Sequence, residues 1–99
     1  MYRHGDLLIK PVAALPDGAA LQPRKGDLIL AEGEATGHAH RIASPDVLLW
    51  EAEGQRYIEV AEPALLTHEE HHQILLAPGY YEVVRQRVYT PEEVRLVAD

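Results

Sequence analysis

Turn signals recur along this chain at short intervals and divide it into brief apolar stretches. Three of them lie at residues 16–18 (Pro-Asp-Gly), 44–46 (Ser-Pro-Asp) and 53–55 (Glu-Gly-Gln). Glycine and proline favour turns because glycine tolerates positive φ angles and proline fixes its own φ. The stretches between the signals are too short for long helices. We therefore predict an all-β fold, a small β-barrel or β-sandwich of about seven short strands.

Individual segments refine this prediction. Residues 47–53 and 55–62 flank a tight connection, which predicts a β-hairpin. Residues 80–89 are rich in β-branched and aromatic side chains, which favour a strand. The C-terminal end differs, because residues 90–93 (Thr-Pro-Glu-Glu) have the pattern of a helix N-terminus with a capping box. We expect a short C-terminal helix of one or two turns there.

Length and charge limit the classes of function. The chain has 99 residues, which predicts a single domain over residues 1–99. Its formal net charge of −7, from 16 acidic and 9 basic residues, disfavours nucleic acid as a partner without excluding it. Cysteine is absent, so any metal must be held by histidine, aspartate or glutamate. No apolar run has the length of a membrane span or a signal peptide, so we expect no membrane partner and a cytoplasmic location.

Five of the six histidines fall into two clusters, at residues 37–41 (Gly-His-Ala-His-Arg) and 68–72 (His-Glu-Glu-His-His). Imidazole is the commonest metal ligand and suits proton transfer near neutral pH. On a strand, residues two apart point to the same side, so His38 and His40 could bind one ion. His4 lies apart from both clusters, and we expect it to be a surface residue or an additional ligand.

Residues 63–78 admit a helical interpretation. In a helix, residues 68–72 would match the motif H-E-x-x-H, with His68 and His72 as zinc ligands and Glu69 as general base. The polar middle of the motif and the small size of the chain both oppose a metalloprotease.

The same segment also admits a hairpin, which we favour. Residues 64–68 and 71–77 would be its strands, and His68 and His71 would face each other across the connection. The two glutamates between them are poor turn residues, so the loop could be wider. The apolar residues directly before the strong strand at residues 80–89 support this interpretation.

These features together predict a divalent metal site formed by His38, His40, His68 and His71. Zinc, nickel, manganese or iron would each suit such ligands, and the sequence does not choose among them. Neutral imidazoles are required for binding, so affinity should fall as the pH drops through roughly 6.5. The expected partners are a small-molecule ligand and, in a homo-oligomer, a second copy of the chain.

Two alternatives stay open at this point, and with them the question whether the protein is an enzyme. In the first, the histidines act without metal as general acid and base in a hydrolase acting on a phosphodiester or RNA. In the second, the chain is a non-catalytic protein-interaction module that assembles through a strand edge.

Part of the chain resembles a known fold family. Gly33, His38, His40, the later His68 or His71 and the Pro-Gly pair at residues 78–79 follow a pattern similar to the metal-binding half of cupin barrels. This resemblance covers about half of the chain and implies a histidine-bound divalent metal in a β-barrel. Two positions depart from the pattern: residues 44–46 stand where an acidic ligand is expected, and the later histidine precedes the Pro-Gly pair.

A second resemblance extends over most of the chain. It is similar to a family of small bacterial proteins that share three segments, G-E-x-T-G-H-x-H-R, H-E-E-H and P-G-x-Y…Q-R-x-Y. The segments correspond here to residues 33–41, 68–71 and 78–89. This resemblance implies no activity.

Overall fold

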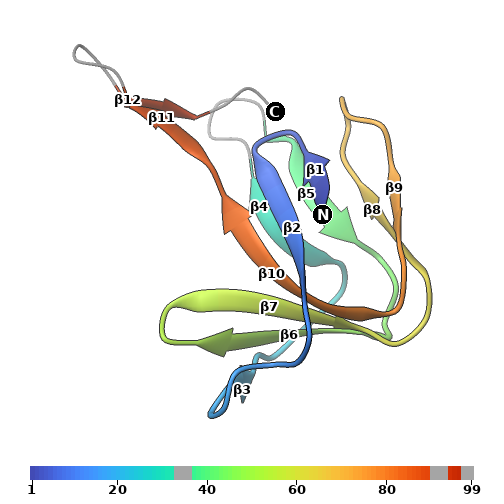
Figure 1. The fold of residues 1–99 in the computed structure, drawn as a ribbon. Coiled ribbons are helices and arrows are strands. Elements are labelled where there is room, and N and C mark those ends of the chain that lie inside the picture. The colour runs from blue at the N-terminus through green and yellow to red at the C-terminus, as the bar shows by residue number, and fades with distance from the viewer. Residues whose placement is uncertain (33–36, 90–93, 97–99) are drawn as a thin grey trace.

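The computed structural model describes residues 1–32, 37–89 and 94–96. Within these residues the chain forms antiparallel β-strands and no helix, which confirms the predicted all-β class. Accordingly, the described part of the chain has no helix long and apolar enough to cross a membrane. Most strands belong to two sheets, and the ladders of the described residues leave both sheets open instead of closing a barrel (Figure 1).

The larger sheet has six strands in the order β1-β2-β10-β7-β6-β3, and the smaller has four in the order β4-β5-β8-β9. The strands of the larger sheet are β1 (Tyr2–His4), β2 (Leu7–Val12), β10 (Gly79–Arg85), β7 (Gln55–Val60), β6 (Val47–Ala52) and β3 (Ala20–Leu21). Those of the smaller sheet are β4 (Leu28–Glu32), β5 (Ala39–Ile42), β8 (Ala64–Thr67) and β9 (Ile74–Leu76).

Side chains from both sheets form one hydrophobic core. Strand alternation explains its composition, because every second residue of a half-buried strand points inward. The larger sheet contributes Leu7, Ile9, Val47, Ile58, Val60, Tyr81 and Val83, and the smaller contributes Leu28, Leu30, Ala31, Ile42, Ala64, Leu66 and Leu76. This shared core joins the two sheets, and one strand of each, β1 and β5, carries a histidine.

The predicted hairpin at residues 47–62 is confirmed. Strands β6 and β7 pair in register from Val47↔Val60 to Ala52↔Gln55. Only Glu53 and Gly54 lie between them, with φ angles of 51° and 78°. Two consecutive positive φ angles are typical of the type I′ turn, whose twist matches that of paired strands.

The C-terminal prediction was wrong. Val94–Leu96 forms strand β12, which pairs antiparallel with β11 (Arg87–Tyr89), so the described part of the predicted helix is a strand. Residues 90–93, which carry the capping-box pattern, lie outside the described residues. A helix of one or two turns is marginal by itself, and pairing with β11 offers the same backbone hydrogen-bond partners along one edge.

The predicted strand at residues 80–89 is divided in two. β10 ends at Arg85 and β11 begins at Arg87. Between them, the amide of Gln86 donates a hydrogen bond to the carbonyl of Asp6 at 2.8 Å. The chain therefore changes its backbone partner at Gln86, beside the turn that follows β1.

Residues 63–78 form the hairpin, and the H-E-x-x-H helix was the wrong alternative. β8 and β9 pair through Ala64↔Leu76, Leu65↔Leu75 and Leu66↔Ile74. The connection covers residues 68–73, so it is wider than the two glutamates and holds the whole second histidine cluster. A loop of this length lets side chains near one another in sequence point in several directions.

Strand β4 carries a register shift that the larger sheet stabilises. The pairing with β5 slips between Ile29 and Ala31, so Leu30 has no opposite residue in β5. The guanidinium group of Arg56 donates to the carbonyl of Leu30, and that of Arg85 donates to the carbonyl of Glu32 at 2.6 Å. Two arginines of the larger sheet thus bind carbonyls of the strand at the edge of the smaller one.

Candidate metal centre

The structure brings the two histidine clusters together. His68 lies at the centre, with its ring centroid 4.5 Å from that of His40, 4.4 Å from that of His71 and 5.6 Å from that of His38. His40 lies on β5, His38 directly precedes this strand, and the other two lie in the β8–β9 loop. All four residues of the predicted ligand set are therefore neighbours.

His4 joins the same group, and its predicted surface position was wrong. Its side chain is only 2 % exposed, and its ring centroid lies 4.9 Å from that of His40 and 5.6 Å from that of His71. His4 is the last residue of β1, and the turn to β2 follows directly. Its burial depends on where the β5 and β8–β9 segments pack, which no pattern around residue 4 indicates.

Gly5 permits the close approach of these rings. Its φ angle is +60°, in the left-handed region that favours glycine. A Cβ atom at this position would lie 2.6 Å from Nε2 of His71 and 3.1 Å from Cε1 of His40. The same Nε2 atom is buried and has no hydrogen-bond partner among the described residues. Packing against the bare backbone of Gly5 thus holds the ring of His71 in place.

The buried half of the group is a chain of contacts that we call the inner relay, formed by His4, His40, Asp6 and Arg85. Nδ1 of His4 lies 2.8 Å from Nδ1 of His40, and Nε2 of His40 lies 3.2 Å from Oδ1 of Asp6. Nε of Arg85 donates to Oδ2 of Asp6 at 2.6 Å. The side chains of His40 and Asp6 are completely buried.

Hydrogen-bond chemistry determines where the protons of the inner relay lie. Nε2 of His4 is 2.8 Å from the carbonyl oxygen of His72, which can only accept, so this nitrogen carries a proton. Burial, together with the neighbouring histidine charges, lowers the pKa of His4 from 6.5 to about 4, although its bond to the His72 carbonyl opposes the shift. The ring is therefore neutral at pH 7, and its Nδ1 accepts a hydrogen bond from Nδ1 of His40.

This direction of donation has a consequence for the next contact. Once Nδ1 of His40 donates to His4, a neutral His40 ring would turn a lone pair toward the carboxylate of Asp6. Nε2 of His40 and Oδ1 of Asp6 are close enough for a hydrogen bond, and a proton between them would satisfy both atoms. Each ring nitrogen of His4 and His40 thus lies within 3.2 Å of a polar atom of another residue, so the inner relay orders the fold.

The half nearer the surface consists of His38, His68 and Glu69, which we call the outer cluster. One donor atom from each of these three residues lies within 4.8 Å of the other two. Nitrogen and oxygen ligands bond to zinc at about 2.0–2.1 Å, which places the donors of a tetrahedral site roughly 3.4 Å apart. A closure of up to about 1.4 Å between donor atoms would therefore bring the outer cluster to coordination distance.

Glu69 is the most firmly held member of the outer cluster. Its Oε2 accepts the amide hydrogen of Ala39 at 2.9 Å, and its Oε1 lies 3.1 Å from Nη2 of Arg41. The hydrogen bond from Ala39 lowers the pKa of the Glu69 carboxyl group, and the charge of Arg41 lowers it further. Glu69 is therefore an ionised oxygen donor anchored to β5.

His68 makes a contact that metal binding would alter. The amide of Glu70 donates to Nδ1 of His68 at 3.0 Å. In a neutral ring this places the remaining proton on Nε2. A metal needs one bare ring nitrogen, so its binding to His68 would release the amide of Glu70 or reverse the tautomer.

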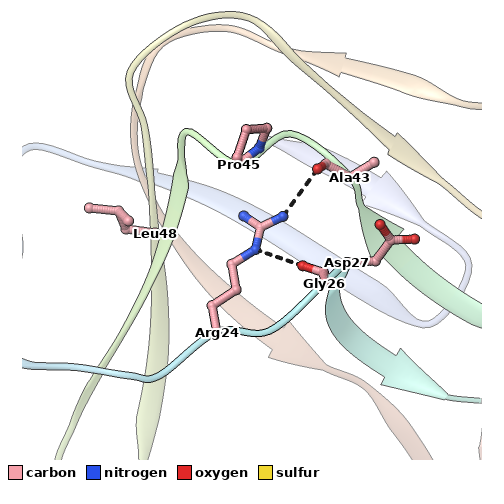
Figure 2. Close-up of a pocket in the computed structure, with 6 residues that line it drawn as sticks. All are labelled: Arg24, Gly26, Asp27, Ala43, Pro45 and Leu48. Carbon is pink, nitrogen blue, oxygen red and sulfur yellow. Dashed lines mark hydrogen bonds between the residues drawn. The ribbon is translucent and has the colours of Figure 1, made fainter.

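A larger cavity lies away from the histidines, and an arginine forms part of its lining (Figure 2). Its volume is about 520 Å³, and it is lined by Arg24, Gly26, Asp27, Ala43, Pro45 and Leu48. The guanidinium group of Arg24 donates to the carbonyls of Gly26 and Val47 at 3.1 and 2.6 Å. It also donates to the carbonyls of Ile42 and Ala43 at 3.0 and 3.3 Å. Because most of its N–H groups are bound to backbone, this cavity offers little to a ligand.

Sequence reasoning found the histidines but missed their partners. Asp6 and Arg85 are 79 residues apart, so no local pattern predicts their contact. Glu69 was considered only as the general base of a helical motif, whereas the structure places it as a carboxylate anchored to β5. The His-Glu adjacency at residues 68–69 was the available signal for the outer cluster.

Comparisons with known proteins give the family of the chain but no activity. No curated protein matches it, and no solved structure does. The family described as "Domain of unknown function (DUF8820)" matches residues 3–86, which include the inner relay and the outer cluster. The chain therefore belongs to the DUF8820 family.

Proposed function

We propose that this protein binds one divalent transition-metal ion through His38, His68 and Glu69. The observation that carries the proposal is the convergence of their three donor atoms within 4.8 Å. Two imidazoles and one carboxylate form a mixed nitrogen and oxygen donor set that suits zinc, nickel, manganese or iron. Three protein ligands leave at least one coordination position for water or a small molecule.

The proposal narrows the ligand set expected from the sequence. His38 and His68 stay in the set and Glu69 joins them. His40 belongs to the inner relay, where both of its ring nitrogens lie close to polar atoms of other residues. His71 lies beside His68, and its Nε2 faces the backbone of Gly5, so closing on a metal would require its ring to turn.

Metal titration of untagged protein tests the proposal. Isothermal titration with zinc and nickel should give one site per chain, and both His38→Ala and Glu69→Gln should weaken binding at least tenfold. Loss of a neighbour that merely orients a ligand already costs roughly 10- to 100-fold. The matched control is His72→Ala, because the side chain of His72 is exposed and only its backbone carbonyl is used in the site.

The outcomes separate the proposal from its alternatives. Wild-type protein that binds no metal, or variants that bind as tightly as wild type, would contradict it. Binding that is as tight at pH 5 as at pH 7.5 would also contradict it, because protonated imidazoles cannot coordinate. A hydrolase without metal would show phosphodiesterase activity that survives chelation, and an interaction module would show neither property.

A further inference from the structure

A second, smaller cavity opens directly beside the outer cluster. Its volume is about 250 Å³, and it is lined by Ala39, Arg41, Thr67, His68 and Glu69. Drug-sized ligands occupy roughly 300–1,000 Å³, whereas one water takes about 30 Å³ of liquid. The cavity therefore fits a ligand of only a few heavy atoms.

Strand pairing places the polar groups of this cavity. Arg41 of β5 is directly opposite Thr67 of β8, so both side chains lie on the same face of the smaller sheet. The hydroxyl of Thr67 donates to the carbonyl of Arg41 at 3.2 Å, which commits its proton to the backbone. Arg41 is left as the principal hydrogen-bond donor and the positive charge of the cavity.

Arg41 retains hydrogen-bonding capacity that Arg24 lacks. Arg24 uses N–H groups on all three of its nitrogens to bind four carbonyls. Arg41, in contrast, contacts Glu69 through Nη2, and its buried Nε has no hydrogen-bond partner among the described residues. A guanidinium group presents five N–H donors in a planar fork that matches a carboxylate or phosphate group.

Glu69 links this arginine to the outer cluster. The same carboxylate pairs with Arg41 and contributes a donor atom to the candidate metal site. A bound divalent cation would draw the charge of Glu69 toward itself and weaken the pair with Arg41. The arginine would then lack a counter-ion, and an anion in the cavity could supply one.

We propose that this cavity binds a small oxyanion, a carboxylate or a phosphate, through Arg41, and that metal and anion bind cooperatively because both act on Glu69. The proposal rests on the proposed metal site and names the chemical class of its ligand. Thermodynamic linkage requires the cooperation to be reciprocal, so the anion must raise metal affinity by the factor by which the metal raises anion affinity.

Calorimetry with two probe anions tests the proposal. Malonate and inorganic phosphate are each titrated into metal-free and nickel-loaded protein, which distinguishes the two anion types. Nickel should raise the affinity for at least one of them about fivefold or more, the lower range of typical coupling factors. Arg41→Gln should abolish this gain while the protein still binds nickel. Arg41→Lys, which retains the charge but not the fork, should fall between the two.

A surface charge elsewhere provides the control. Lys10 is half exposed and pairs with Glu82 on the larger sheet, so Lys10→Gln removes one positive charge away from the cavity. This variant should bind both anions as wild type does. Nickel binding without any anion effect, or an anion effect that survives in Arg41→Gln, would overturn this inference and leave the metal site standing. Absence of nickel binding in wild type would overturn both.

Discussion

The inner relay and the outer cluster both combine histidine, a carboxylate and a neighbouring arginine, but they differ in role. The first orders the fold, and the second is the proposed ligand site. In the inner relay, two completely buried side chains and a nearly buried His4 are bound to one another and to Arg85. In the outer cluster, His38 and Glu69 are partly exposed and border a cavity. A buried polar group is stable only when it is bonded, whereas a ligand site needs donors that can exchange partners. Burial, more than residue type, therefore separates the histidines that order this fold from those that could do chemistry.

The comparison predicts its largest effect at Asp6. Asp6→Asn should lower the free energy of unfolding by about 4 kcal/mol, because removal of one partner leaves a buried charge uncompensated. Urea denaturation measures the change. Glu82→Gln, which breaks the partly exposed pair with Lys10, should cost less than about 1 kcal/mol. Equal costs at the two positions would show that the inner relay has no special structural role.

The free energy of unfolding should depend on pH between 4 and 6.5 because of the lowered pKa of His4. Its pKa is about 4 in the folded protein and 6.5 in the unfolded chain, so between these values only the unfolded chain binds the proton. The free energy of unfolding should therefore decrease as the pH falls from 6.5 to 4, by roughly 3 kcal/mol at about 1.4 kcal/mol per unit. Denaturation of wild type and of His4→Gln over this range measures the difference in slope.

The control for this experiment is again His72→Ala, which should keep the wild-type slope. Glutamine at residue 4 retains an N–H donor for the carbonyl of His72 but does not titrate. An identical slope in wild type and His4→Gln would mean that His4 takes up its proton in the folded protein as readily as in the unfolded chain.

The backbone at Gly5 provides a further test of how tightly the buried histidines are packed. Gly5→Ala should cost about 3 kcal/mol, from a positive φ angle and from a Cβ atom 2.6 Å from the ring of His71. Gly18→Ala measures the cost of the positive φ angle alone, because Gly18 has a φ angle of +78° and no atom within 4 Å of the added Cβ. It should cost about 1 kcal/mol. The contact explanation fails if thermal denaturation gives the two variants equal stability.

The smallest effect on stability is expected in the outer cluster. His38→Ala should change the free energy of unfolding by less than about 1 kcal/mol, because its ring is partly exposed and its pair with Glu70 spans 3.6 Å in solvent. The same variant should lose metal affinity, as proposed above. A large loss of stability at His38 would instead place it with the residues that order the fold.

Local patterns predicted the elements that depend on local chemistry. The hairpins at residues 47–62 and 63–78 follow from turn residues and apolar runs in the sequence. The strand at Val94–Leu96 was mistaken for a helix, because its pairing with β11 outweighs a capping pattern that lies just before it.

The site was predictable only in part, for a physical reason. The His-x-His pair and the histidine-rich loop indicated which residues meet, but burial determines what each one does. Asp6, Arg85 and His4 become partners of His40 through contacts between distant segments. Such long-range contacts depend on how the two sheets pack, and a single sequence contains no local signal for that packing.

Arg24 has a consequence for how the molecule opens. Its guanidinium group binds the chain where β5 of the smaller sheet leads into β6 of the larger one, with hydrogen bonds to the carbonyls of Ile42, Ala43 and Val47. Figure 2 shows the bond to Ala43. Arg24 thereby adds a link between the two sheets at the point where the chain crosses from one to the other. Loss of Arg24 should therefore speed amide exchange around this crossover, while the shared core keeps both sheets in one cooperative unit.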